Sequence, residues 1–121
     1  MIGYMMMGTN DLEKAAAFYD QVLAELGGQR AMVTDRFVGY SNGQGAMFAI
    51  VKPNDGKPAT VGNGTMAAFA ASSRDAVNAA YKKALELGAT DEGAPGERGT
   101  GFYGAYFRDL DGNKAVAFIM G

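Results

Sequence analysis

The stretch Phe107-Arg108-Asp109-Leu110-Asp111-Gly112-Asn113-Lys114 decides the fold of this chain. It joins two apolar runs, 102–108 and 114–120, that are each long enough to form a strand. Asp-Gly between two such runs is a strong short-range signal of a β-hairpin. Asp109 and Asp111 are expected to shape this turn by accepting hydrogen bonds from backbone amides, rather than to form a paired-carboxylate site. The chain is therefore predicted to end in a strand pair.

The region before this hairpin is predicted to contain a strand and a helix. Residues 65–71 have strand character, and apolar residues recur at helical spacing over 75–87. Ser72-Ser73 supplies the helix cap and Gly88 ends the helix. Between helix and hairpin, residues 91–96 interrupt any alternation of polar and apolar residues. The strand expected there is predicted to be short or absent.

The first half of the chain shows the same order of elements. Both predicted helices end in a Leu-Gly pair, and both are followed by a hairpin signal, which in the first half is Asn42-Gly43. The elements predicted here are a strand at 1–7, a helix at 11–26 and strands at 29–34, 36–41 and 46–52. The chain is therefore predicted to be a degenerate repeat of strand-helix-strands.

A polar, turn-rich segment at 53–63 separates the two halves. At 121 residues the chain is large enough for one hydrophobic core but too short for two independent ones. We therefore predict a single domain over 1–121, with repeat one at about 1–52, the linker at 53–63 and repeat two at about 64–121.

This tandem order resembles the vicinal oxygen chelate superfamily, which includes glyoxalases, bleomycin-resistance proteins and extradiol dioxygenases. Residues 8–15 together with Phe18-Tyr19 look like the family's G-x-x-D-L-x-x-A…F-Y start. Residues 107–113 look like its F-x-D-P-D-G-N finish, although Leu110 replaces the usual proline. The resemblance covers the whole chain. It implies an α+β fold in which tandem βαβββ repeats form a curved, cleft-bearing mixed β-sheet with flanking helices.

The resemblance also implies where a metal ion would be held, because family enzymes place their ligands near the middle of four strands. Those positions fall on Tyr4, Met47, Met66 and Val116, and a shift by one pleat would bring in Met6, Ala49, Ala68 or Phe118. The chain has no histidine and no cysteine. Divalent ions prefer oxygen or imidazole donors, whereas thioether sulfur is soft. We therefore predict no metal and no cofactor.

Without a metal, the concave face of the sheet is still expected to bind a small molecule. Methionine adapts its shape and aromatic rings stack, so such a surface suits apolar or planar ligands. The residues expected to contact the ligand are Tyr4, Met6, Met47, Met66, Ala68, Tyr103, Val116 and Phe118. The chain is predicted to sequester an apolar or aromatic compound as a homodimer, since members of the family usually build their pockets with a partner chain. The alternative for these side chains is a filled core between sheet and helices.

The sequence is also compatible with two other functions. One is a lyase, isomerase or dioxygenase with relocated metal ligands, and the other is an interaction module that uses the dimer surface. Acid-base catalysis without histidine would need a shifted carboxylate, tyrosine or lysine. The polar candidates near the predicted sheet are Tyr4, Tyr40, Tyr103, Tyr106 and Arg108. Residues of these types at such positions more often have a structural role, so no catalytic residue is assigned.

Charge and hydropathy restrict the partners. The 13 acidic and 11 basic residues give a net charge of −2, and the basic residues are scattered. This argues against nucleic acid or an anionic membrane as partner. The longest uncharged stretch, 58–73, is too short and too rich in small residues to span a membrane. The first eight residues do not look like a secretory signal, so a cytoplasmic location is expected.

Overall fold

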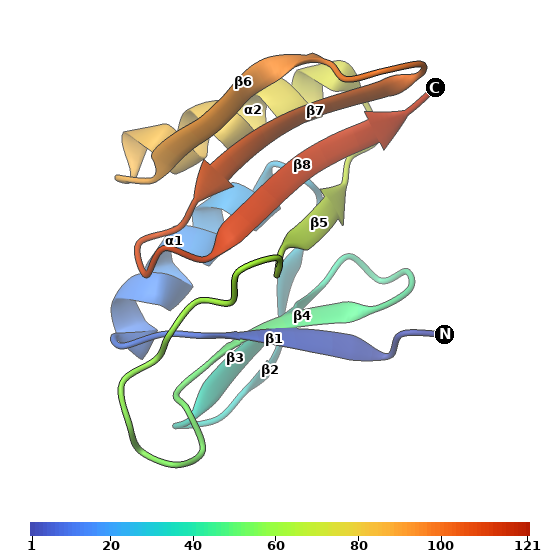
Figure 1. Cartoon of the computed structure of the whole chain (residues 1–121). Coiled ribbons are helices and arrows are strands. Elements are labelled where there is room, and N and C mark those ends of the chain that lie inside the picture. Colours follow the sequence, from blue (N-terminus) through green and yellow to red (C-terminus); the bar gives the residue numbers. More distant parts are fainter.

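The computed structural model describes residues 1–121, the whole chain, as two copies of the order β-α-β-β-β (Figure 1). The first copy consists of β1 (Tyr4–Gly8), α1 (Leu12–Ala24), β2 (Gln29–Val33), β3 (Phe37–Ser41) and β4 (Met47–Val51). The second consists of β5 (Ala67–Ala70), α2 (Arg74–Glu86), β6 (Thr90–Glu97), β7 (Phe102–Arg108) and β8 (Lys114–Met120). The predicted α+β fold with tandem repeats is therefore confirmed.

The eight strands form two separate mixed sheets, one for each copy. The first sheet has the order β1-β4-β3-β2 and the second has the order β5-β8-β7-β6. In each sheet the opening strand runs parallel to the last one, with Tyr4 opposite Met47 and Ala68 opposite Val116. The other pairings are antiparallel, as the two predicted hairpins require. Both halves thus repeat one topology.

The prediction that the strand after the second helix would be short or absent was wrong. Strand β6 has eight residues and pairs with β7, with register shifts between Asp91 and Gly93 and again between Gly93 and Gly96. These irregularities take up the residues that break the alternation. Because β6 is an edge strand, Pro95 is tolerated there although it has no amide hydrogen to donate.

The helix ends follow the predicted signals. The Asp11 carboxylate accepts a hydrogen bond from the Lys14 amide at 3.1 Å, and the Ser73 hydroxyl accepts one from the Ala76 amide at 3.0 Å. Gly27 and Gly88, just beyond the two helices, have φ of 80° and 106°, which favours glycine. Neither helix combines the length and the apolar character needed to cross a membrane.

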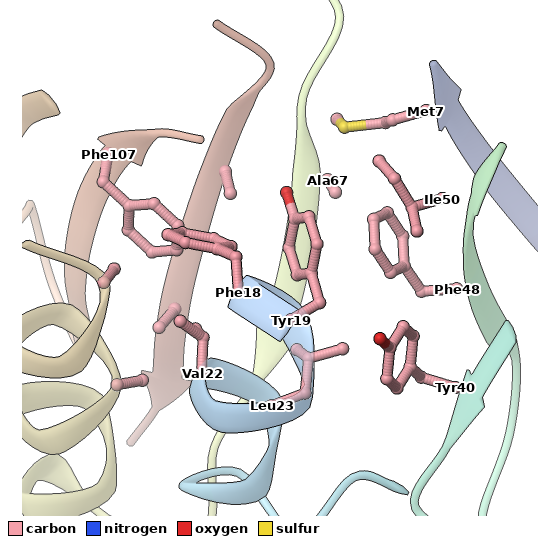
Figure 2. Close-up of a cluster of buried hydrophobic side chains, with 14 of the residues drawn as sticks. Met7, Phe18, Tyr19, Val22, Leu23, Tyr40, Phe48, Ile50, Ala67 and Phe107 are labelled. Atoms are coloured by element: carbon pink, nitrogen blue, oxygen red, sulfur yellow. The ribbon is translucent and has the colours of Figure 1, made fainter. Parts of the chain in front are cut away.

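Helix α1 lies between the two sheets and carries the centre of the core (Figure 2). The Phe18 ring points toward the second sheet, with its centroid 6.3 Å from that of Phe107. The neighbouring Tyr19 ring points toward the first sheet, with its centroid 5.0 Å from that of Phe48. The side chains of Phe18 and Tyr19 are both almost completely buried. The faces of the two sheets that point away from this core, called here the outer faces, are consequently free of the helices.

A buried carboxylate ties α1 to the closing hairpin. Asp109 accepts hydrogen bonds from the Tyr19 hydroxyl at 2.6 Å and from the backbone amides of Asp111 and Asn113, both at 2.9 Å. The side-chain amide of Asn113 donates to Asp109 and to the carbonyl of Gly8 in the first repeat. The expectation that the two carboxylates shape the turn through backbone amides is confirmed for Asp109, whereas Asp111 accepts from the Asn10 amide of the first repeat. The same hairpin also links the two repeats.

Candidate functional site

The outer face of the first sheet carries a cluster of large apolar side chains. Strand residues alternate between faces, so Met7 points to the core while Tyr4 and Met6 point outward. The outward-pointing side chains surround a hollow of about 380 Å³ on this face. Its lining residues are Tyr4, Met6, Met32, Arg36, Phe37, Met47 and Ala49. Tyr4, Met6 and Met32 are 65%, 36% and 52% exposed, so the hollow opens to solvent.

Glycine shapes the floor of this hollow. Gly39 lies opposite Ala49 in the register of β3 and β4. A Cβ at Gly39 would come within 2.9 Å of the Met47 terminal methyl group. The absence of a side chain therefore lets Met47 lie across the neighbouring strand.

The other predicted ligand residues lie in the second repeat, and none of them lines this hollow. Val116 is 1% exposed, and Phe118 stacks on Phe102 with centroids 5.4 Å apart and planes 2° apart. Tyr103 points toward α2, where its hydroxyl donates to Asn78 at 2.7 Å. Met66 immediately precedes β5 and Ala68 lies within it.

One chain therefore does not bring all the predicted ligand residues together. Because the core fills the space between the two sheets, their outer faces point away from each other (Figure 2). Tyr4, Met6 and Met47 gather on one outer face, whereas Val116 and Phe118 belong to the other sheet. Met32 and Phe37, which are not among the residues predicted for the site, complete the hollow from strands β2 and β3.

A second cavity, of about 270 Å³, opens between the halves on the core side of the first sheet. Its apolar wall includes Leu23 and Leu26 from the end of α1, together with Phe48 and Phe69. Ser41, Asn42 and Gln44 of the β3–β4 hairpin form a polar part of the lining. Ala68 lines this second cavity rather than the outer hollow.

The four positions at which the family would hold a metal do not fit a divalent ion. Tyr4 lies directly opposite Met47 in the first sheet, and Val116 is buried in the second. Two of the four side chains are thioethers and one is an alkyl group, which are poor ligands for hard or borderline divalent ions. No group of three or more acidic side chains is placed to hold a metal ion anywhere in the chain.

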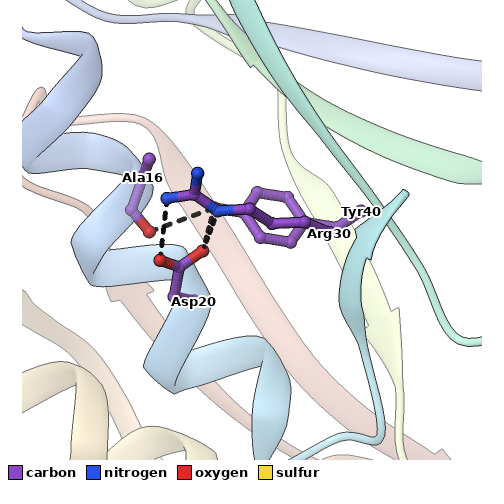
Figure 3. A network of polar contacts seen from close by, with 4 residues as sticks. All are labelled: Ala16, Asp20, Arg30 and Tyr40. Carbon is purple, nitrogen blue, oxygen red and sulfur yellow. Dashed lines mark hydrogen bonds and ion pairs between the residues drawn. The ribbon is translucent and has the colours of Figure 1, made fainter. Parts of the chain in front are cut away.

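A polar network fastens β2 and β3 to α1 beside the second cavity (Figure 3). Arg30 donates two hydrogen bonds to the Asp20 carboxylate, at 2.8 and 2.9 Å, and the Tyr40 hydroxyl donates to Asp20 at 2.9 Å. The bonds from Arg30 lower the pKa of Asp20 from its ordinary value of 3.8, and the Tyr40 bond assists. Burial and the nearby Asp20 raise the pKa of Tyr40 well above its ordinary value, so Tyr40 remains a neutral donor.

Replacing Arg30 with glutamine is expected to destabilise the protein by about 0.5 kcal/mol near neutral pH, because exposed ion pairs contribute little. Since the folded pKa of Asp20 is depressed, this contribution is present above pH 3.8 and is lost as the pH falls below it. Urea unfolding of both proteins between about pH 7 and 2.5 measures the difference. A difference that stays constant over this range would contradict the assignment, and Arg36→Gln, which removes a charge that pairs with no carboxylate, is the control.

Comparison with known proteins agrees with this architecture. A family model described as the Glyoxalase/Bleomycin resistance protein/Dioxygenase superfamily matches residues 1–116. The crystal structure of a glyoxalase/bleomycin resistance protein from Albidiferax ferrireducens T118 is 37% identical, with a TM-score of 0.93 over 100% of this chain and 99% of that one. A glyoxalase/bleomycin resistance protein/dioxygenase family enzyme from Burkholderia phytofirmans PsJN is 20% identical, with a TM-score of 0.78 over 98% of both chains, and supports the fold alone. No curated protein gives a significant match. The chain belongs to the glyoxalase/bleomycin resistance protein/dioxygenase superfamily.

Proposed function

We propose that this chain is a metal-free small-molecule-binding protein that sequesters an apolar or aromatic compound. The observation that supports the proposal most directly is the hollow on the outer face of the first sheet. Its volume of about 380 Å³ falls within the range of about 300–1,000 Å³ that is usual for small-molecule sites. Its lining combines aromatic rings with flexible methionines, which suit planar apolar ligands.

We also propose a homodimer, because Tyr4, Met6 and Met47 lie on one outer face and Val116 and Phe118 on the other, and one chain cannot bring these two faces together. In such a dimer, the first sheet of one copy would face the second sheet of its partner. Tyr4 and Met47 of one copy would then close the site with Met66 and Phe118 of the other. Large apolar side chains are exposed on the first outer face and directly before β5 of the second sheet, with Tyr4 65% and Met66 38% exposed.

Light scattering is expected to give twice the mass of one chain at micromolar concentration. Met66→Lys should shift the protein toward the monomer, because it places a charge on a surface that dimerisation would bury. Val61→Lys is the matched control, since Val61 is 45% exposed but lies in the connection between the repeats. A wild-type protein that is monomeric under these conditions would exclude the dimer.

Binding is tested with N-phenyl-1-naphthylamine, a neutral probe whose emission rises in an apolar environment. We expect saturable binding by the wild type and about tenfold weaker binding by Met6→Gln, because the variant loses part of the apolar contact with the probe. Val61→Gln should bind as the wild type does. Absence of saturable binding by the wild type, or equal affinity for both variants, would argue against the hollow as the site.

Metal analysis separates this proposal from the enzymatic alternative. Protein purified without a metal-affinity resin is expected to contain far less than one divalent ion per chain. Stoichiometric metal would instead support a lyase, isomerase or dioxygenase with relocated ligands, and would overturn the metal-free proposal.

A further inference from the structure

The outer face of the second sheet carries two cations without acidic partners. The guanidinium carbon of Arg98 and the ammonium nitrogen of Lys114 each lie 5.6 Å from the centroid of the Tyr106 ring. Four ion pairs are present in the chain, and neither Arg98 nor Lys114 belongs to any of them. The neighbouring Arg108 is already neutralised by Glu92 at 2.9 Å. Two uncompensated positive charges thus flank one aromatic ring, in a chain whose net charge is −2.

The position of Arg98 depends on two glycines of β6. Its guanidinium donates to the carbonyl of Ala94 at 2.6 Å. A Cβ on Gly93 would come within 3.1 Å of one terminal guanidinium nitrogen, and a Cβ on Gly96 within 2.9 Å of the other. These glycines leave the space in which the guanidinium lies against β6. Arg98 is therefore held near Tyr106, although its guanidinium group donates only one hydrogen bond within the chain.

An apolar surface adjoins the two cations on the same face. Along paired strands β7 and β8, Gly104 lies opposite Phe118 and Tyr106 lies opposite Val116. The Phe102 ring extends over Gly104, where a Cβ would come within 2.7 Å of it, and stacks on Phe118. The Lys114 ammonium lies beside the Tyr106 ring, and Tyr106 pairs with Val116, which is two residues, or about 7 Å, from Phe118 along β8. Aromatic surface and positive charge thus lie within the length of a small planar molecule with a terminal anionic group.

We propose that the outer face of the second sheet binds the anionic group of the ligand, which is a planar apolar molecule that carries a carboxylate. Arginine and lysine form charge-assisted hydrogen bonds with carboxylates, and the guanidinium can pair with both carboxylate oxygens. Phe102 and Phe118 would contact the planar part of the same molecule. This inference rests on the proposed function in two respects, namely that the chain binds a small molecule and that its homodimer brings the two outer faces together.

Calorimetric titration of the wild-type protein with 2-naphthoate and with its neutral isostere 2-naphthamide tests the inference. We expect 2-naphthoate to bind about tenfold more tightly than 2-naphthamide, because it alone forms the charge-assisted bonds. The preference should shrink in about 0.5 M NaCl, which screens the charges. Equal affinity for the two compounds would overturn the inference, while binding of N-phenyl-1-naphthylamine would leave the proposed function standing. Failure of all three compounds to bind would overturn both.

A double variant locates the effect. Arg98→Gln with Lys114→Gln is expected to abolish the preference for 2-naphthoate, because it weakens 2-naphthoate binding far more than 2-naphthamide binding. Lys57→Gln with Lys82→Gln removes the same net charge from exposed sites elsewhere and should keep the preference. A preference that survives in the first double variant would assign the anion to another site.

Amide NMR spectra of the wild type add a readout that needs no variant. 2-naphthoate, but not 2-naphthamide, should shift the signals of Arg98, Tyr106 and Lys114, and unshifted signals would overturn the inference.

Discussion

Replacing Phe18 with alanine is expected to lower the free energy of unfolding by about 3–5 kcal/mol. The Phe18 side chain is 2% exposed, and its ring packs edge-on against Tyr19 with centroids 5.0 Å apart. On its other side it approaches Phe107 of the second sheet. The ring therefore fills the space between α1 and the second sheet, and its loss leaves a cavity that both elements line. Urea unfolding monitored by circular dichroism measures the change.

Phe18→Leu tests whether the cost follows the amount of buried side chain that is removed. Because leucine keeps most of the buried apolar surface, we expect this variant to be destabilised by only about 1–1.5 kcal/mol. Lys82→Ala, on the exposed side of α2, should unfold within about 0.5 kcal/mol of the wild type. A loss below about 1 kcal/mol for Phe18→Ala would show that α1 does not join the two halves through this ring.

Replacing Asp109 with alanine is expected to cost about 3–5 kcal/mol, because the change leaves several buried donors without an acceptor. The Asp109 carboxylate is 5% exposed and accepts from the Tyr19 hydroxyl, from two backbone amides and from the Asn113 side chain. Tyr19 is completely buried, so its hydroxyl has no access to solvent. Burial, followed by the negative charge of Asp109, raises the pKa of Tyr19 well above its ordinary value, so this hydroxyl stays protonated.

Two control variants show how much of this loss comes from the Tyr19 hydrogen bond and how much from removing any carboxylate of the hairpin. Tyr19→Phe removes one donor and leaves the Asp109 turn intact, so a loss of about 1–2 kcal/mol is expected. Asp111→Ala removes a carboxylate that accepts from the exposed Asn10 amide and should cost less than about 1 kcal/mol. Equal losses for Asp109→Ala and Asp111→Ala would mean that the buried Asp109 carboxylate contributes no more than the exposed Asp111 carboxylate.

The order of the elements was predictable because local signals coincide with the ends of most of them. Asp11 and Ser73 cap the two helices, and Asn-Gly and Asp-Gly lie between the strands of the two hairpins. These signals depend on short-range backbone chemistry, which does not need the tertiary structure. Strand β6 was not predicted at its full length, because its pairing with β7 contains bulges that interrupt the alternating pattern.

The candidate site was less predictable, because it depends on which sheet and which face each residue occupies. Alternation along β1 places Met6 on the outer face and Met7 in the core, as expected for adjacent strand residues. Tyr103 lies on the helix-facing side of β7, although it was expected near the ligand. Met32 was not recognised because a register shift in β2, between Arg30 and Met32, changes which residues share a face. Tertiary arrangement also separates the two halves of the predicted pocket, which a strand-by-strand analysis cannot anticipate.

The confinement of each strand pairing to its own repeat also affects how the chain reaches its native state. No strand of the first sheet has to find a partner in the second, so each half can acquire its register without waiting for the other. What remains is the closure of the two sheets around α1, where Phe18 meets Phe107 and Tyr19 reaches Asp109. Cooperativity between the halves therefore depends on this turn of α1 together with the hydrogen bond from the Asn113 side chain to Gly8 and the contact of Phe48 with Phe69. Side chains of the helical turn are expected to influence whether the halves unfold together or one after the other.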